Sequence, residues 1–63
     1  METFAEKLQA MRTGAGWTRP KVVERVGVPL RTLEDWEASR RTPPDYVQRL
    51  VLDRLALEIE KDK

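Results

Sequence analysis

The chain has 63 residues, of which 40% are hydrophobic and 37% are charged, and its net charge at pH 7 is +1. This length allows one domain, residues 1–63, near the lower size limit for independent folding, and the composition excludes a disordered tail and a membrane-spanning segment. The sequence contains no cysteine and no histidine, which excludes disulfides, thiolate metal sites and the commonest general base, and we expect no metal and no cofactor.

The first predicted helix covers residues 3–13. Phe4, Leu8 and Met11 recur at spacings of four and three, so they share one helix face, and charged side chains occupy other positions. Gly14 and Gly16 are expected to end this helix.

A second helix is predicted to begin after Thr18, whose hydroxyl can cap its N-terminus. Pro20 then falls in the first turn, where its missing N–H costs nothing. The buried face of this helix is expected to consist of Val22, Val23 and Val26.

A tight turn is predicted between the second helix and a third helix over about Leu30 to Ala38. Gly27 supplies the positive φ that often closes a helix, and Val28-Pro29 forces an extended step. Leu33 and Trp36 lie three residues apart, which places both on the inner side. The outer side is expected to carry Arg31, Glu34 and Asp35.

A basic, proline-rich loop from Ser39 to Pro44 is expected to lead into a long last helix over about residues 43–61. Thr42 and Asp45 have the spacing of a capping box, in which the hydroxyl accepts a backbone N–H while the carboxylate reaches back. No segment has the alternating pattern of a strand. The sequence therefore predicts an all-α fold of four helices.

The last helix is apolar on two sides. One side carries Tyr46, Val47, Leu50, Val51 and Leu57, and the second carries Leu52, Leu55, Ala56 and Ile59. A domain this small is not expected to cover both sides, so the second side predicts the interface of a homodimer. The alternative is that the second side only enlarges the core of a monomer.

Charge is unevenly distributed along the chain. Residues 12–41 contain seven basic and four acidic residues, a net charge of +3, whereas residues 55–63 are slightly acidic. Any face that binds nucleic acid is therefore expected in the middle of the chain. Two short helices joined by a tight turn can place the second helix in the DNA major groove, although an ordinary helical hairpin has the same spacing.

The stretch from Phe4 to Pro43, roughly two thirds of the chain, resembles the Cro and phage-repressor (XRE-like) family of helix-turn-helix transcriptional regulators. The matching elements are Phe4-x-x-x-Leu8-x-x-Met11-Arg12, Thr18, Glu24-Arg25-Val26-Gly27-Val28, Thr32-Leu33, Trp36-Glu37 and Arg40-Arg41-Thr42-Pro43. The sequence departs from the family at Arg19, Val23 and Ser39, where glutamine, alanine and glycine are usual, and at Pro29 and Leu30, which are often polar.

The resemblance implies a lambda-repressor-like fold, with the motif at about residues 18–38 and a C-terminal dimerisation helix at about 43–61. It implies that the bases are read by Leu30, Arg31, Glu34 and Asp35. It implies that the phosphates are bound by Arg12, Thr18, Arg19, Arg40 and Arg41. The implied function is a homodimeric repressor of its own or neighbouring genes, of phage or mobile-element type, that binds double-stranded DNA at an inverted-repeat operator.

Several residues have a second interpretation. Arg31 presents two donors that fit guanine, but it can also form an i,i+4 salt bridge with Asp35 or a pair with Glu34. Trp17 is expected to pack on the core rather than to stack on a ligand, and Trp36 is expected in the core. Lys21 and Arg25 are assigned either to DNA binding or to the solvated surface.

Two other classes of function are weighed. An enzyme is disfavoured because Glu34, Asp35 and Glu37 are interleaved with positive charge on one short helix. A protein-interaction module, such as an antitoxin or an anti-repressor that uses its apolar last helix, is the main alternative. No basic stretch precedes an apolar segment as in a secretion signal, so a cytoplasmic location is expected.

Overall fold

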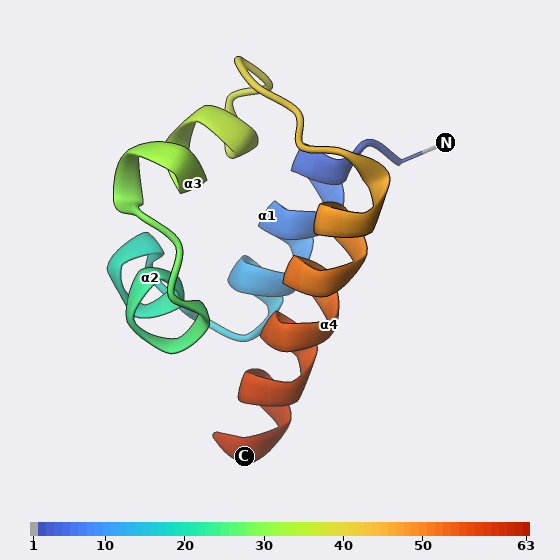
Figure 1. Ribbon diagram of the computed structural model, residues 1–63. Helices are drawn as coiled ribbons and strands as arrows, with labels where there is room; N and C mark the ends of the chain where they lie inside the picture. Colours follow the sequence, from blue (N-terminus) through green and yellow to red (C-terminus); the bar gives the residue numbers. More distant parts are fainter. Residues whose placement is uncertain (1) are drawn as a thin grey trace.

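Four α-helices are present in the computed structural model, which describes residues 2–63. They are α1 (Phe4–Gly14), α2 (Arg19–Val26), α3 (Leu30–Glu37) and α4 (Asp45–Lys61). No strand occurs in this part of the chain, so the prediction of an all-α fold is confirmed. The long α4 runs beside α1, and α2 and α3 lie at the left of both in Figure 1; α2 packs against α3 and α4, and α3 packs against α1. None of the described helices has the length and apolar character needed to cross a membrane.

Side-chain caps determine where α1 and α2 begin. The Glu6 amide donates to Thr3 Oγ1 and the Thr3 amide donates to Glu6 Oε1, each at 3.1 Å, so Thr3 and Glu6 form a capping box. This box starts α1 at Phe4, one residue later than expected. Thr18 caps α2 as predicted, because its hydroxyl accepts a hydrogen bond from the Lys21 amide at 3.4 Å.

The connection between α2 and α3 is as tight as the sequence predicts. Gly27 has a φ of 91°, in the left-handed region that glycine adopts without strain, and its amide donates to the Val23 carbonyl at 2.9 Å. Pro29 is extended, with ψ at 146°, and its carbonyl accepts from the Leu33 amide to open α3. Three residues, 27–29, therefore reverse the chain and bring α3 back against α2.

The start of α4 differs from the prediction. Its N-cap is Pro44, no side chain caps it, and the proposed capping box of Thr42 and Asp45 is wrong. Asp45 is the first helical residue, so Thr42 lies two residues before the N-cap, too early to accept a bond from the first turn. The Pro44 carbonyl instead accepts the amides of Val47 and Gln48, each at 3.0 Å.

Each helix contributes one fully buried side chain to the core. These are Leu8 from α1, Val22 from α2, Leu33 from α3 and Leu55 from α4. Phe4 packs edge-on against Trp36, with ring centroids 5.5 Å apart. Trp17 and Trp36 are both buried, which confirms the prediction that they belong to the core.

The buried face of α4 lies elsewhere than expected. Leu55 has no exposed surface, so its assignment to a dimer interface is wrong: it fills the chain's own core. Leu52 and Ile59 are partly buried against that core, and Ala56 alone of the four predicted interface residues is exposed. The side expected to face inward instead leaves Tyr46, Leu50 and Leu57 exposed.

Candidate nucleic-acid interface

Two acidic side chains of α3 are buried, and each holds arginines that come from other segments. Glu37 Oε2 accepts a hydrogen bond from Arg12 Nε at 2.9 Å, and Oε1 accepts bonds from Arg12 Nη2 and Arg19 Nε, each at 3.0 Å. Arg12 Nη1 donates to the Trp17 carbonyl at 3.1 Å. This cluster joins α1, the start of α2 and the end of α3.

Arg12 is therefore a structural residue. Its side chain is only 15% exposed, and all three of its guanidinium nitrogens already donate to atoms of the chain. The assignment of Arg12 to a DNA phosphate stays a prediction, and its guanidinium is already engaged in a bidentate pair with a buried carboxylate. Arg19 differs, since only its Nε is engaged and its side chain is half exposed.

Asp35 is the second buried acid and holds the loop that follows α3. Its Oδ1 accepts from Arg40 Nε at 3.0 Å, and its backbone carbonyl accepts the amides of Arg40 and Arg41 at 2.9 and 3.4 Å. Asp35 is 8% exposed and already paired, so it presents little surface to a base in this structure, and its assignment to base reading stays a prediction.

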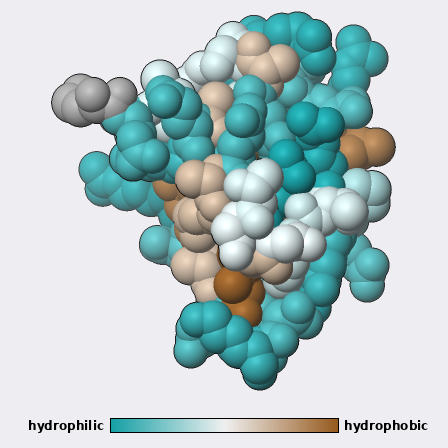
Figure 2. Space-filling model, turned by 180° about the vertical axis from the view of Figure 1, so that it is seen from behind, coloured by the Kyte–Doolittle hydropathy of each residue, from teal (hydrophilic) through white to brown (hydrophobic). Residues whose placement is uncertain are grey.

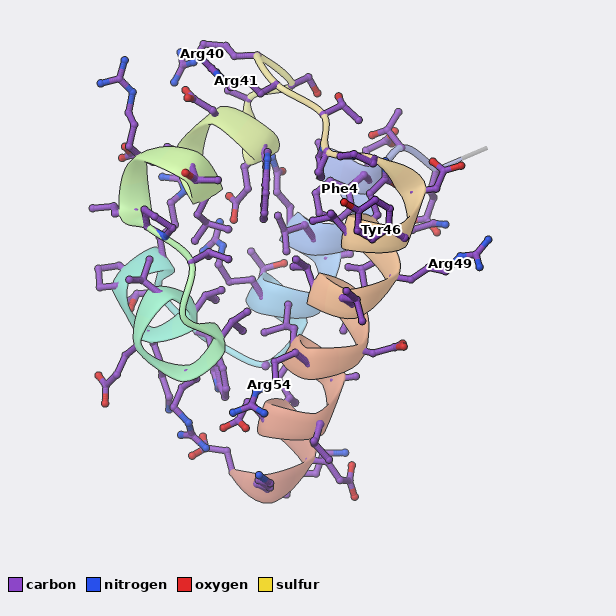
Figure 3. All side chains as sticks on the ribbon, viewed as in Figure 1. Phe4, Arg40, Arg41, Tyr46, Arg49 and Arg54 are labelled. Carbon is purple, nitrogen blue, oxygen red and sulfur yellow. The ribbon has the colours of Figure 1, made fainter. Side chains whose placement is uncertain are left out.

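Three exposed arginines surround Asp35, and we call Arg31, Arg40 and Arg41 the arginine cluster. The Nε atoms of Arg31 and Arg41 lie 3.8 Å from Asp35 Oδ2. Their side chains are 87% and 80% exposed, and within residues 2–63 the Nη atoms of all three arginines make no hydrogen bond. Figure 3 shows Arg40 and Arg41 on the outside of the loop beyond α3. The cluster has three positive charges for one carboxylate, so it presents free donors to an anion.

A shallow hollow of about 380 Å³ separates the N-terminal turns of α2 and α3. It is lined by Arg12, Thr18, Arg19, Pro20, Leu30 and Glu34. Three of the predicted phosphate-binding residues and two of the predicted base-reading residues thus share one surface; they are Arg12, Thr18 and Arg19, and Leu30 and Glu34. The N-terminus of α2 opens at this hollow, and the positive end of its helix dipole favours an anion.

A second group of charges ties α2 to the C-terminal end of α4, and the sequence reasoning missed it. Arg25 Nε donates to Glu58 Oε1 at 3.1 Å, and Arg25 Nη1 donates to Asp62 Oδ1 at 3.0 Å. Lys21 Nζ donates to Asp62 Oδ2 at 3.0 Å and lies 4.8 Å from the centre of the Trp17 ring. Lys21 and Arg25 are therefore interhelical ties, as their spacing of four on α2 permits.

These ties shift the pKa values of the groups that form them. The hydrogen bond from Arg25 is the main reason that the pKa of Glu58 is lowered. The pKa of Asp62 is lowered by the hydrogen bond from Lys21 and, next, by that from Arg25. Asp62 and then Glu58 raise the pKa of Arg25. Each shift has the sign expected when the charged form is hydrogen-bonded to an opposite charge.

Within residues 2–63, no three histidine, cysteine, aspartate or glutamate side chains are grouped as metal ligands. Comparisons with protein-family models, curated proteins and solved structures find no match for this chain. The family resemblance of the sequence therefore stays a prediction.

Proposed function

We propose that this chain is a helix-turn-helix protein of the lambda-repressor type that binds double-stranded DNA in a sequence-specific way. The observation that carries this proposal is the outer face of α3, which is exposed at Leu30 and Arg31 and bordered by the free arginines of the loop. A helix held on one side by Leu33 and Trp36 and free on the other is suited to the major groove, which is about 12 Å wide.

Arg31 is the proposed reader of the base sequence. It lies in the first turn of α3, and its two terminal amino groups fit the O6 and N7 acceptors of guanine. The ion pair with Asp35, at 3.8 Å, is loose enough to leave those groups free while it limits where the guanidinium points. The salt bridge and the base contact are therefore compatible, and Leu30 and Glu34 complete the reading surface.

The phosphate contacts are proposed at Thr18, Arg19, Arg40 and Arg41, which lie on both sides of the outer face of α3. The exposed guanidinium groups and the N-terminus of α2 supply positive potential without reading the sequence. Two copies of the chain would bind an inverted repeat, with half-site centres about 34 Å apart. In this role the protein represses its own or neighbouring genes.

Substitution of Arg31 tests the proposal. The operator is first selected from a random duplex library, and affinity for it is then compared with affinity for random duplex by electrophoretic shift. Arg31→Ala is expected to cost about 1–3 kcal/mol per half-site on the operator and little on random DNA, because only a base contact is lost. Arg31→Lys keeps the charge but lacks the planar fork, so specificity should relax while the salt dependence stays.

Lys7→Ala is the control, since Lys7 is an exposed basic residue of α1 that has no assigned contact to DNA. If Arg31→Ala lowered the affinity for operator and random duplex equally, Arg31 would be a phosphate contact. If it changed neither affinity, the ion pair with Asp35 would be the only role of Arg31. Absence of any shift at low salt would contradict DNA binding.

A second candidate function is supported by the exposed apolar side chains of α4. A protein-interaction module, such as an antitoxin or anti-repressor, would use Tyr46, Leu50 and Leu57 to bind another protein. Such a module requires no affinity for random duplex at low salt, so the same electrophoretic experiment separates the two functions.

A further inference from the structure

One acidic side chain of α3 lies at the centre of the arginine cluster. Asp35 Oδ1 accepts a hydrogen bond from Arg40 Nε at 3.0 Å, which leaves Oδ2 for the other two arginines. Arg31 Nε and Arg41 Nε each lie 3.8 Å from Oδ2. The Asp35 side chain is 12% exposed, whereas those of Arg31 and Arg41 are 87% and 80% exposed. A nearly buried carboxylate is therefore surrounded by guanidinium groups that remain accessible.

The position of this carboxylate is well determined. Asp35 lies in α3 next to the buried Trp36, so helix packing holds its backbone. The Asp35 carbonyl accepts the amides of Arg40 and Arg41, which holds the loop, and Arg40 Nε then occupies Oδ1. Oδ2 is thus held towards Arg31, which lies one helical turn earlier on α3.

An arginine at the surface of a recognition helix has two competing partners on DNA. Phosphates follow each other at about 3.4 Å along each strand, so an unrestrained guanidinium can bind a phosphate instead of a guanine. A phosphate contact adds affinity for every DNA and contributes nothing to sequence preference. The preference for an operator over random DNA therefore depends on keeping the reading arginine away from the phosphates.

We propose that Asp35 is a positioning residue that keeps the Arg31 guanidinium over the outer face of α3 and away from the DNA phosphates. In this role Asp35 determines how strongly the protein prefers its operator to random DNA. The pair is made through Arg31 Nε, so the two terminal amino groups are left for guanine O6 and N7. This inference rests on the proposed DNA-binding function and deepens it, because Asp35 acts through Arg31 and does not itself contact a base.

Binding of a phosphate by the loop strengthens this restraint. The single negative charge of Asp35 is shared among three arginines, and Arg41 competes with Arg31 for Oδ2. Arg41 extends from the loop, so it can turn to a phosphate while α3 stays in place. Once Arg41 has left, Oδ2 attracts Arg31 without a competing cation beside it. The phosphate contact and the restraint on the reading arginine are therefore coupled.

The surface between α1 and α4 has a different balance of charge. The rear view shows a strip of apolar and weakly polar surface between hydrophilic flanks (Figure 2). A groove of about 410 Å³ between α1 and α4 is lined by one acid, Glu60, and one base, Lys63, whose charged atoms lie 3.4 Å apart. In Figure 1 the C-terminal end of α4 and the loop after α3 lie at opposite ends of the molecule. Glu60 is therefore a matched control, since it is an acid paired with a single base far from the arginine cluster.

Electrophoretic shifts of the full chain on the selected operator and on random duplex test the proposal. Asp35→Asn keeps the shape of the side chain and an oxygen that can accept from Arg40, but it lacks the charge. Affinity for random duplex should rise about fivefold, because Arg31 is free to bind a phosphate, while affinity for the operator should change by less than about twofold. The ratio of the two affinities should fall accordingly, whereas Glu60→Gln should leave it unchanged. An unchanged ratio in Asp35→Asn, or an equal fall in Glu60→Gln, would overturn the proposal.

A double variant tests whether Asp35 acts through Arg31. In the Arg31→Ala background, Asp35→Asn should leave the ratio of operator to random affinity unchanged, because the side chain that Asp35 positions is absent. A ratio that still falls in this background would make Asp35 a direct reader of a base and would contradict a positioning role.

The wild type offers a measurement that does not depend on the folding of a variant. In a titration with inorganic phosphate, followed by nuclear magnetic resonance of the arginine Nε–H groups, the Arg41 signal should move at a lower phosphate concentration than the Arg31 signal. Movement of Arg31 first, or of both together, counts against the restraint. A wild type that shifts neither duplex at low salt contradicts the proposed function itself. A wild type that prefers its operator, and keeps that preference in Asp35→Asn, contradicts only the role of Asp35.

Discussion

Two groups of ion pairs in this molecule are built from the same parts but leave different charges exposed. One lies beside α3 and the loop after it, and the other joins α2 to the C-terminal end of α4. In both, carboxylates accept hydrogen bonds from arginine Nε atoms at 2.9–3.1 Å. The Arg25 side chain in the second group is 26% exposed, whereas that of Arg31 in the first is 87% exposed.

The difference follows from where the basic residues come from. Arg25 and Lys21 lie on a packed helix and face Glu58 and Asp62 on another, so their donors are used within the fold. Arg40 and Arg41 lie on a loop that is fastened to Asp35 mainly by its backbone. In the group between α2 and α4, the buried Glu58 therefore holds two helices together. In the group beside α3, the buried Asp35 holds a loop whose arginines remain free to bind a ligand.

The largest expected effect is on the free energy of unfolding, from substitution of the buried Glu37 of α3. Glu37→Ala removes the partner of Arg12 and leaves that guanidinium enclosed and unpaired, which should cost about 3–5 kcal/mol. This loss approaches the whole stability of a chain this small, so the cooperative unfolding transition in urea should largely disappear. Glu24→Ala, at an exposed position on α2, should change stability by less than about 0.5 kcal/mol. Equal stability of the two variants would contradict the structural role of Glu37.

An intermediate effect is expected on the salt dependence of DNA affinity, and it should differ between arginines of the two groups. Arg41→Ala should lower the slope of log affinity against log salt by about 1 per subunit, because one phosphate contact is lost. Arg25→Ala removes the same charge from the other group and should leave the slope unchanged while it lowers stability. The proposed division between ligand-binding and structural arginines fails if both variants lower the slope alike.

The smallest expected effect is the loss of stability when low pH protonates the carboxylates that join α2 to α4. The pKa values of Glu58 and Asp62 are lowered in the folded state, so their contribution to stability is complete above their ordinary pKa values. It is lost as the pH falls below about 4 through the lowered values. The stability difference between the wild type and Asp62→Asn, measured by urea unfolding, should therefore be present at pH 7 and shrink in acid. A difference independent of pH would contradict this ion pair.

The sequence by itself determined much of the local structure. The hydrophobic spacing, Thr18, Gly27 and Pro29 located α2, α3 and the turn between them, because caps and turns depend on a few neighbouring residues. The same reasoning placed Leu33 and Trp36 inside and Arg31 outside. It failed at the start of α4, where Pro43 and Pro44 separate Thr42 from the helix that it was expected to cap.

Only the tertiary structure decided which polar side chains are internal and which face of α4 is covered. Asp35 and Glu58 look like surface residues in the sequence, since nothing near them reveals that arginines from elsewhere will enclose them. On α4 both sides are apolar, so periodicity could not choose between Leu55 and Leu50, and the packing of α1 and α2 against the helix made the choice. Burial depends on contacts between residues far apart in the chain, and a local pattern contains no information about them.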